Sequence, residues 1–222
     1  MVRIKYYGHA CFALDAGDTS VLIDPWLTGN PEVGHIPDDV RPTLILVTHN
    51  HEDHVGDAIE LSKRHGAPIV ATPHAARHYI AEGAAAIRLH LGGRERFEWG
   101  SVKCVPAFHD SPIGTGTTFR LLLGAPCGFV VTIGGKRVYH AGDTCLFGDM
   151  DLFAPVDVAM LPMDGKMTME PADAVRAAKF TQAGLVLPMH ARQEDPHAFV
   201  KLLAEEGIQG RAMARGETLE LT

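Results

Sequence analysis

Three histidines and one aspartate fall within six consecutive positions, at the spacing His-x-His-x-Asp-His. These residues are His49, His51, Asp53 and His54. Because alternate residues of an extended chain point the same way, His49 and His51 can bind one ion. Asp53 and His54 lie further along the chain and can face a second ion. The segment therefore predicts a metal site that holds two ions side by side.

The segments on either side of these residues are expected to hold them rigidly. Residues 43–47 form an apolar, β-branched run typical of a buried strand, and a helical pattern begins at Val55. The candidate ligands would then occupy a loop between a strand and a helix.

Three further candidate ligands lie elsewhere in the chain: His109, Asp143 and His190. Each lies just past the carboxyl end of a predicted apolar strand. At this rim of a sheet, side chains project into a shared crevice, which is also where His49 is expected. His9 lies at the mouth of the first predicted hairpin, and the sequence leaves open whether it faces the same crevice.

The predicted elements follow a similar order in the two halves of the chain. In the first half, strands are expected at 2–7, 10–14, 20–23, 43–47, 68–71 and 86–90, with helices at 57–65 and 73–82. In the second half, strands are expected at 102–107, 129–133, 136–140, 156–161 and 185–188, helices at 170–180 and 195–205, and two short strands around 215–216. This order predicts an α/β (α+β) fold with two sheets packed face to face and helices on the outer faces.

Three segments are expected to be loops that border the site and select the substrate: 25–42, 110–118 and 191–195. The segment between the Gly-Gly at 92–93 and the strand at 102–107 is arginine-rich and is also predicted to be a loop. Arg192 is a candidate contact for an anionic substrate group, or simply a solvated loop charge.

The composition narrows the class of protein. The chain has 222 residues, of which 46% are hydrophobic, which is enough for one large core. We therefore expect residues 1–222 to form one domain. The formal charge of −7 and the pI near 6.0 argue against stable binding to nucleic acid. A small-molecule substrate is the expected partner.

The cysteines and the apolar segments bear on the cellular compartment. The four cysteines form no Cys-x-x-Cys pair and are expected to be reduced and mostly buried, Cys145 among the buried ones. The N-terminus lacks a long apolar segment, and the apolar stretch at 121–133 is interrupted by Gly and Pro. We therefore expect a soluble, cytoplasmic protein without membrane insertion.

The motifs together resemble the metallo-β-lactamase superfamily, and within it a branch of small metal-dependent hydrolases. The chain is similar also to the ascorbate-phosphate lactonases and the N-acylphosphatidylethanolamine phospholipases. Besides 48–57, the matching motifs are Gly8-His9-Ala10-Cys11-Phe12, Asp24-Pro25-Trp26-Leu27, Phe108-His109, His140-Ala141-Gly142-Asp143-Thr144, Pro188-Met189-His190 and Gly216-Glu217-Thr218. The resemblance implies a four-layer αββα sandwich. Members of this superfamily often form dimers or larger assemblies, so a homo-oligomer is possible.

The resemblance also implies a role for each candidate ligand. His49, His51 and His109 would hold the first ion, and Asp53, His54 and His190 the second. Asp143 would bridge the two ions, where a cysteine would instead indicate the antibiotic-hydrolysing enzymes. Asp24 would orient a ligand histidine.

The implied chemistry is hydrolysis by a hydroxide that bridges two divalent ions. Asp53 would be catalytic, because it can receive the proton and pass it to the leaving group. Imidazoles and carboxylates without thiolates suit zinc, our first expectation, but also manganese or iron.

The bond that is hydrolysed stays open between an ester, a lactone and a phosphodiester of a small molecule. The alternatives are a nucleic-acid phosphodiesterase, and a metal-binding scaffold or sensor without turnover. The chain departs from the family pattern in the short segment after His190 and at 164–167. The short segment after His190 implies a shorter pocket wall, and with both departures a relative's substrate does not carry over to this chain.

Overall fold

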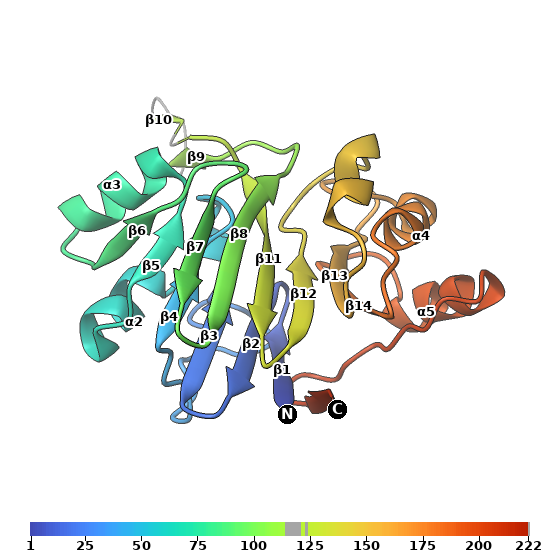
Figure 1. Cartoon of the computed structure of the whole chain (residues 1–222), viewed down its shortest axis with the longest axis horizontal. Coiled ribbons are helices and arrows are strands. Elements are labelled where there is room, and N and C mark those ends of the chain that lie inside the picture. Colours follow the sequence, from blue (N-terminus) through green and yellow to red (C-terminus); the bar gives the residue numbers. More distant parts are fainter. Residues whose placement is uncertain (114–120, 123, 222) are drawn as a thin grey trace.

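The computed structural model describes residues 1–113, 121–122 and 124–221. Two sheets lie face to face, with helices outside them (Figure 1). The expected αββα sandwich is confirmed.

The first sheet has seven strands in the order β15-β1-β2-β3-β4-β5-β6. Their bounds are β15 (Thr218–Leu221), β1 (Val2–Gly8), β2 (Cys11–Ala16), β3 (Thr19–Ile23), β4 (Leu44–Leu46), β5 (Ile69–Ala71) and β6 (Ala86–Arg88). Pairing is antiparallel from β15 to β3 and parallel from β3 to β6. The helices on this side are α1 (Glu52–Val55), α2 (Ala58–His65) and α3 (Pro73–Ala81).

The second sheet has six strands in the order β14-β13-β12-β11-β8-β7. Their bounds are β14 (Leu185–Met189), β13 (Val158–Pro162), β12 (Lys136–His140), β11 (Cys127–Ile133), β8 (Gly100–Pro106) and β7 (Arg94–Phe97). Helices α4 (Pro171–Phe180) and α5 (Pro196–Glu205) pack on β13 and β14, and the 3₁₀ helix η1 (Gly148–Phe153) precedes β13. A separate short pair joins β9 (Pro112–Ile113) to β10 (Leu121–Leu122).

Side-chain alternation along the strands explains the layers. Ile4 of β1 and Phe12 of β2 point inward and share one buried cluster with Phe129 of β11, so the two sheets close over a common core. On the opposite face of the first sheet, Ile45 packs in a second cluster with Leu61 of α2. This face is therefore covered by the helices.

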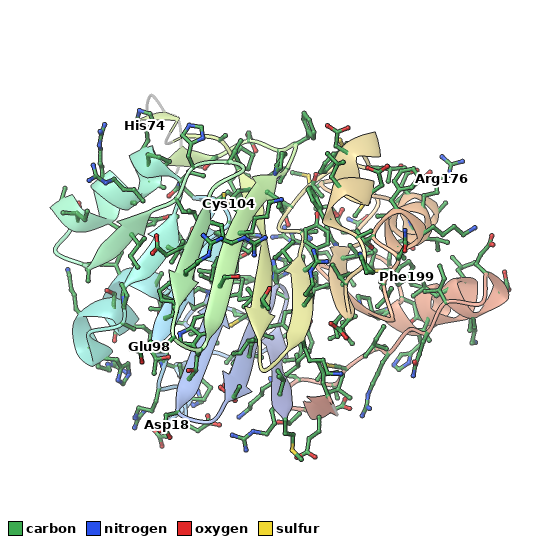
Figure 2. The ribbon with its side chains drawn as sticks, viewed as in Figure 1. Asp18, His74, Glu98, Cys104, Arg176 and Phe199 are labelled. Carbon is green, nitrogen blue, oxygen red and sulfur yellow. The ribbon has the colours of Figure 1, made fainter. Side chains whose placement is uncertain are left out.

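The carboxyl ends of the parallel strands lie at one end of the sandwich. Asp18 and Glu98 lie in the turns of two hairpins, at the end away from His74 (Figure 2). His74 lies in the first turn of α3, directly after β5, so the strand ends that carry candidate ligands face the His74 end. Among the described residues, no helix is both long and apolar enough to cross a membrane.

Three expectations about elements were wrong. The arginine-rich segment is not a loop but edge strand β7, which pairs with β8 and alternates exposed and half-buried residues. The helical pattern expected from Val55 is interrupted at Gly56, where α1 ends, whereas the helix expected at 57–65 is confirmed as α2. Of the two short strands expected around 215–216, only β15 forms, and the segment before it makes a single bridge, between Gly210 and Val186 of β14.

Gly56 interrupts the helical pattern because a loop packs directly against it. Its φ is +37°, and an added Cβ would lie 2.4 Å from the carbonyl oxygen of Pro25 and 2.5 Å from Cα of Trp26. The next residue, Asp57, accepts hydrogen bonds from the backbone N–H groups of Leu27 and Thr28 at 3.0 and 2.8 Å. The long loop after β3 is thus fixed to the segment that carries the candidate ligands.

We expect Gly56→Ala to lower the free energy of unfolding by about 2–5 kcal/mol, from overpacking and a strained φ. Gly66→Ala is the matched control, because Gly66 also has a positive φ, +69°, but nothing lies near its Cβ position. The control should cost only about 1–2 kcal/mol. Chemical denaturation of both variants measures the difference, and equal costs would contradict the close packing at Gly56.

Candidate metal centre

All the candidate ligands lie together at one end of the sandwich. His49, His51, Asp53 and His54 follow β4 of the first sheet, and His109, Asp143 and His190 follow β8, β12 and β14 of the second. Their donor atoms form two groups, His49, His51, His109 and Asp143 in one, and His9, Asp53, His54 and His190 in the other. We call these the first and the second cluster. Within each cluster the donor atoms lie within 4.8 Å of one another.

In the first cluster, ring nitrogens face one another. Nδ1 of His51 lies 2.9 Å from Nε2 of His49 and 3.2 Å from Nε2 of His109. Asp143 completes the cluster, with Oδ2 3.6 Å from Nε2 of His109 and 4.0 Å from Nε2 of His49. Three imidazoles and one carboxylate thus point at a common centre.

The second cluster adjoins the first through the same carboxylate. Oδ2 of Asp143 is 3.1 Å from Nε2 of His190, and Oδ1 is 3.3 Å from Nε2 of His54. Asp53 approaches from the other side, with Oδ2 3.3 Å from Nε2 of His9 and 3.9 Å from Nε2 of His190. Asp143 therefore lies between the two clusters.

On His54, His51 and His190 the outward nitrogen faces a carboxylate oxygen, which leaves the inward nitrogen free to bind a cation. Nδ1 of His54 lies 2.7 Å from Oδ2 of Asp24, Nε2 of His51 3.2 Å from Oδ1 of Asp110, and Nδ1 of His190 3.3 Å from Oδ2 of Asp164. A carboxylate hydrogen-bonded in this way, as Asp24 is to His54, fixes the tautomer of a metal-binding histidine. The arrangement fits divalent ions.

Buried atoms without hydrogen bonds support the same conclusion. Among the described residues, Nε2 of His54 and Oδ1 of Asp143 are buried and have no hydrogen-bond partner. Unsatisfied polar atoms are costly in a protein interior, and a bound cation is one ordinary way in which they are satisfied. The donor set, imidazoles and carboxylates, is one that divalent metals use.

Asp24 organises the start of the ligand segment. It is fully buried and accepts hydrogen bonds from N–H and Oγ1 of Thr48, at 2.9 and 2.8 Å. Because the Thr48 hydroxyl donates its only proton to Asp24, it accepts from Nδ1 of His49, 2.9 Å away. Nε2 of His49 is then the unprotonated nitrogen, and it points into the first cluster.

Burial and charge set the protonation of the clusters. Burial lowers the pKa of His49 well below its ordinary value and that of His9 to about 4. Burial also opposes protonation of His54, but the carboxylates of Asp143 and Asp24 outweigh it and raise the pKa of His54 well above its ordinary value. A positive charge is therefore favoured between these two carboxylates.

The two carboxylates of the clusters are held ionised. Burial alone would raise the pKa of Asp143, but His54 and His190 outweigh it and hold the pKa well below the usual range. For Asp53, burial is likewise outweighed, here by His9, His54 and Arg192, and its pKa also lies below the usual range. Both carboxylates are therefore in the form that binds metal.

The structure also settles what the sequence left open and shows what it missed. His9 faces the crevice and belongs to the second cluster. The guanidinium of Arg192 pairs with Asp53. Asp110 and Asp164 were not predicted, although Asp164 follows β13 much as Asp143 follows β12 and could have been found by the same signal.

The cysteines are all free, and three are buried as expected. Cys145 is exposed, so the expectation of a small buried residue there was wrong. It lies in the loop between Asp143 and η1, where its backbone N–H donates to the carbonyl of Phe108 and the side chain points outward. Cys145 does not belong to either cluster.

A two-sheet sandwich with such clusters at its strand ends defines a known class. Residues 3–190 match the model of the β-lactamase superfamily domain. The chain belongs to the metallo-β-lactamase superfamily.

Similar proteins narrow the assignment of this chain within the metallo-β-lactamase superfamily. It is 42% identical over 228 residues to a "UPF0173 metal-dependent hydrolase" of Thermus thermophilus, covering all of both chains. A protein of the same description from Opitutus terrae is 42% identical over 227 residues, 99% of this chain and 100% of the relative. The structure of the metallo hydrolase Igni18 from Ignicoccus hospitalis has a TM-score of 0.89 at 30% identity, over 100% of this chain and 99% of that one. The protein is thus a metal-dependent hydrolase, as expected from the sequence.

Proposed function

We propose that the protein is a dinuclear hydrolase that cleaves an ester, lactone or phosphodiester bond of a small molecule. The observation that carries the proposal is the position of Asp143 between the two clusters, 3.1 Å from Nε2 of His190 and 3.6 Å from Nε2 of His109. A carboxylate in this position can bridge two ions.

In this proposal each cluster holds one ion. His49, His51 and His109 would hold the first ion, Asp53, His54 and His190 the second, and Asp143 would contribute to both. His9 adds a neutral imidazole beside Asp53. Zinc is the ion that we expect first, and manganese and iron suit the same donors.

Divalent ions held there would lower the pKa of a bound water from 15.7 to roughly 7 and would polarise the oxygen of the bond under attack. Asp53 is the proposed proton acceptor. Its low pKa keeps it ionised, and its side chain retains 19% exposure, so it can reach a substrate. After accepting a proton, Asp53 can deliver it to the leaving group.

The surrounding carboxylates keep these groups in place. Asp24 holds His54, Asp110 lies against His51, and Asp164 lies against His190. Preorganised rings lose little conformational freedom when a substrate arrives, which favours reaction.

A substrate screen tests the proposal. Metal-reconstituted protein is assayed with chromogenic ester, lactone, thioester and phosphodiester substrates, and with oligonucleotides. We expect turnover of at least one small ester, lactone or phosphodiester. Cleavage of oligonucleotides alone would indicate a nucleic-acid phosphodiesterase, and full metal content without any turnover would indicate a scaffold or sensor.

We expect Asp24→Asn to weaken metal binding by about 10- to 100-fold, because an amide no longer fixes the tautomer of His54. Competition with a chromogenic chelator measures the affinity. Asp157→Asn is the control, since Asp157 also accepts a backbone hydrogen bond, from Arg137 at 2.7 Å, but lies before β13, at its amino end. Equal affinity in the Asp24 and Asp157 variants would refute the role of Asp24.

A further inference from the structure

Arg192 places a positive charge beside the second cluster. Its guanidinium pairs with Asp53, although its side chain remains 50% exposed. Among the ion pairs of the described residues, this is the only one that joins an arginine or lysine to a member of either cluster. The charge is therefore both close to the centre and open to solvent.

The chain holds Arg192 in this position from both sides. His190, two residues earlier, has a positive φ of 50° and its N–H donates to the carbonyl of His9 at 3.0 Å. Three residues later, Asp195 caps α5 by accepting from the N–H of His197 at 2.9 Å. The segment 191–194 is thus short and anchored at each end.

A purely structural ion pair does not account well for this arrangement. Partly exposed pairs contribute little to stability, because water screens them and two side chains must be ordered. When Asp53 binds a metal ion, that ion neutralises its charge, and the attraction between Asp53 and Arg192 weakens. The guanidinium is then available to another anion at little cost.

Arginine has the geometry to bind an oxyanion. Its planar guanidinium is always charged and presents a fork of N–H donors that matches two oxygens of a carboxylate or phosphoryl group. Both groups share this chemistry.

We infer that the substrate carries a carboxylate or phosphoryl group and that Arg192 binds it beside the second cluster. This inference rests on the proposed hydrolytic function. It makes Arg192 a residue that determines substrate specificity, through the segment between β14 and α5.

Anion binding to the metal-loaded protein tests the inference without relying on turnover. Inorganic phosphate and acetate are titrated separately by calorimetry into wild-type protein, after excess metal has been removed. We expect Arg192→Gln to weaken binding of at least one anion about tenfold or more, and Arg192→Lys to weaken it less, because lysine keeps the charge but not the fork. If the loss of Arg192 weakens phosphate binding more than acetate binding, the substrate group is a phosphoryl group. If it weakens acetate binding more, the group is a carboxylate.

Arg211→Gln is the matched control. Arg211 is 47% exposed and also pairs with a single carboxylate, that of Glu217, away from both clusters. We expect this variant to bind both anions as the wild type does. Metal content is measured for every variant, and we expect Arg192→Gln to keep the same content as the wild type.

Two results would overturn the inference. If Arg192→Gln binds both anions as tightly as the wild type, Arg192 does not contact an anionic group. If Arg192→Gln loses metal, the arginine instead positions Asp53. The substrate screen distinguishes a failure of this inference from a failure of the proposed hydrolysis. If the wild-type protein turns over no substrate but still binds anions through Arg192, only the proposed hydrolysis is refuted.

Discussion

Asp143→Ala is expected to abolish hydrolysis and to reduce the metal content from two ions per chain to one or none. Asp143 approaches His109 at 3.6 Å, His54 at 3.3 Å and His190 at 3.1 Å, and so is the only side chain that we assign to both ions. Losing the shared ligand removes several kcal/mol of transition-state stabilisation, which corresponds to a fall of about a thousandfold or more in kcat/KM.

The control for this variant is Asp149→Ala. Asp149 is an exposed carboxylate in η1, six residues further along the chain, and it belongs to neither cluster. Its replacement should leave metal content and activity unchanged. Elemental analysis and circular dichroism are measured on both variants, and two ions per chain in a folded Asp143→Ala protein would defeat the bridging assignment.

Removing the metal is expected to abolish activity and to lower the melting temperature substantially. A ligand present at 1,000 times its Kd stabilises the native state by about 4 kcal/mol. For a chain of this size, each kcal/mol of unfolding free energy changes the melting temperature by about 2–4 °C. Two ions would contribute about twice as much as one, so chelation should lower the melting temperature by about 16–32 °C, because the buried carboxylates and imidazoles would lose the cations that compensate them.

Differential scanning calorimetry of the chelated and reconstituted protein measures this shift. Returning the metal should restore both the melting temperature and the activity, which excludes irreversible damage by the chelator. Identical melting temperatures with and without metal would mean that the clusters do not hold an ion in the folded state.

Much of the fold is predictable because its buried strands are short apolar runs bounded by turn residues. In β1 the buried Val2 and Ile4 alternate with Arg3 and Lys5, whereas the first four residues of β2 and all of β13 are buried, so there the sequence shows only an apolar run. Edge strand β7 was missed because its pattern, Arg-Glu-Arg-Phe, contains little apolar surface. Its pairing with β8 depends on backbone hydrogen bonds rather than on burial, and composition does not reveal those.

The break at Gly56 was missed for a different reason. A glycine in a helical pattern is usually tolerated, and only the approach of Pro25 and Trp26 from another segment explains the turn. Such close contacts between distant segments leave no periodic signal. The sequence therefore predicts the helix at 57–65 but not the separate short helix α1 that ends before Gly56.

The candidate ligands were predictable to the extent that they cluster locally or follow strands. His49, His51, Asp53 and His54 have a spacing that few other functions require, and Asp143 has a strand before it. Asp110 is harder to predict, because its carboxylate is 66% exposed and acts on His51, which lies 59 residues earlier. The roles of such partners depend on how two sheets come together.

The central claim, two ions joined by Asp143, is tested most directly by anomalous diffraction from crystals of metal-loaded protein, measured above and below the absorption edge of the bound metal. We predict two anomalous peaks about 3.5–4 Å apart. One should lie among His49, His51 and His109, the other among Asp53, His54 and His190, with the Asp143 carboxylate contacting both. A single peak, or two peaks that Asp143 does not join, would contradict the account.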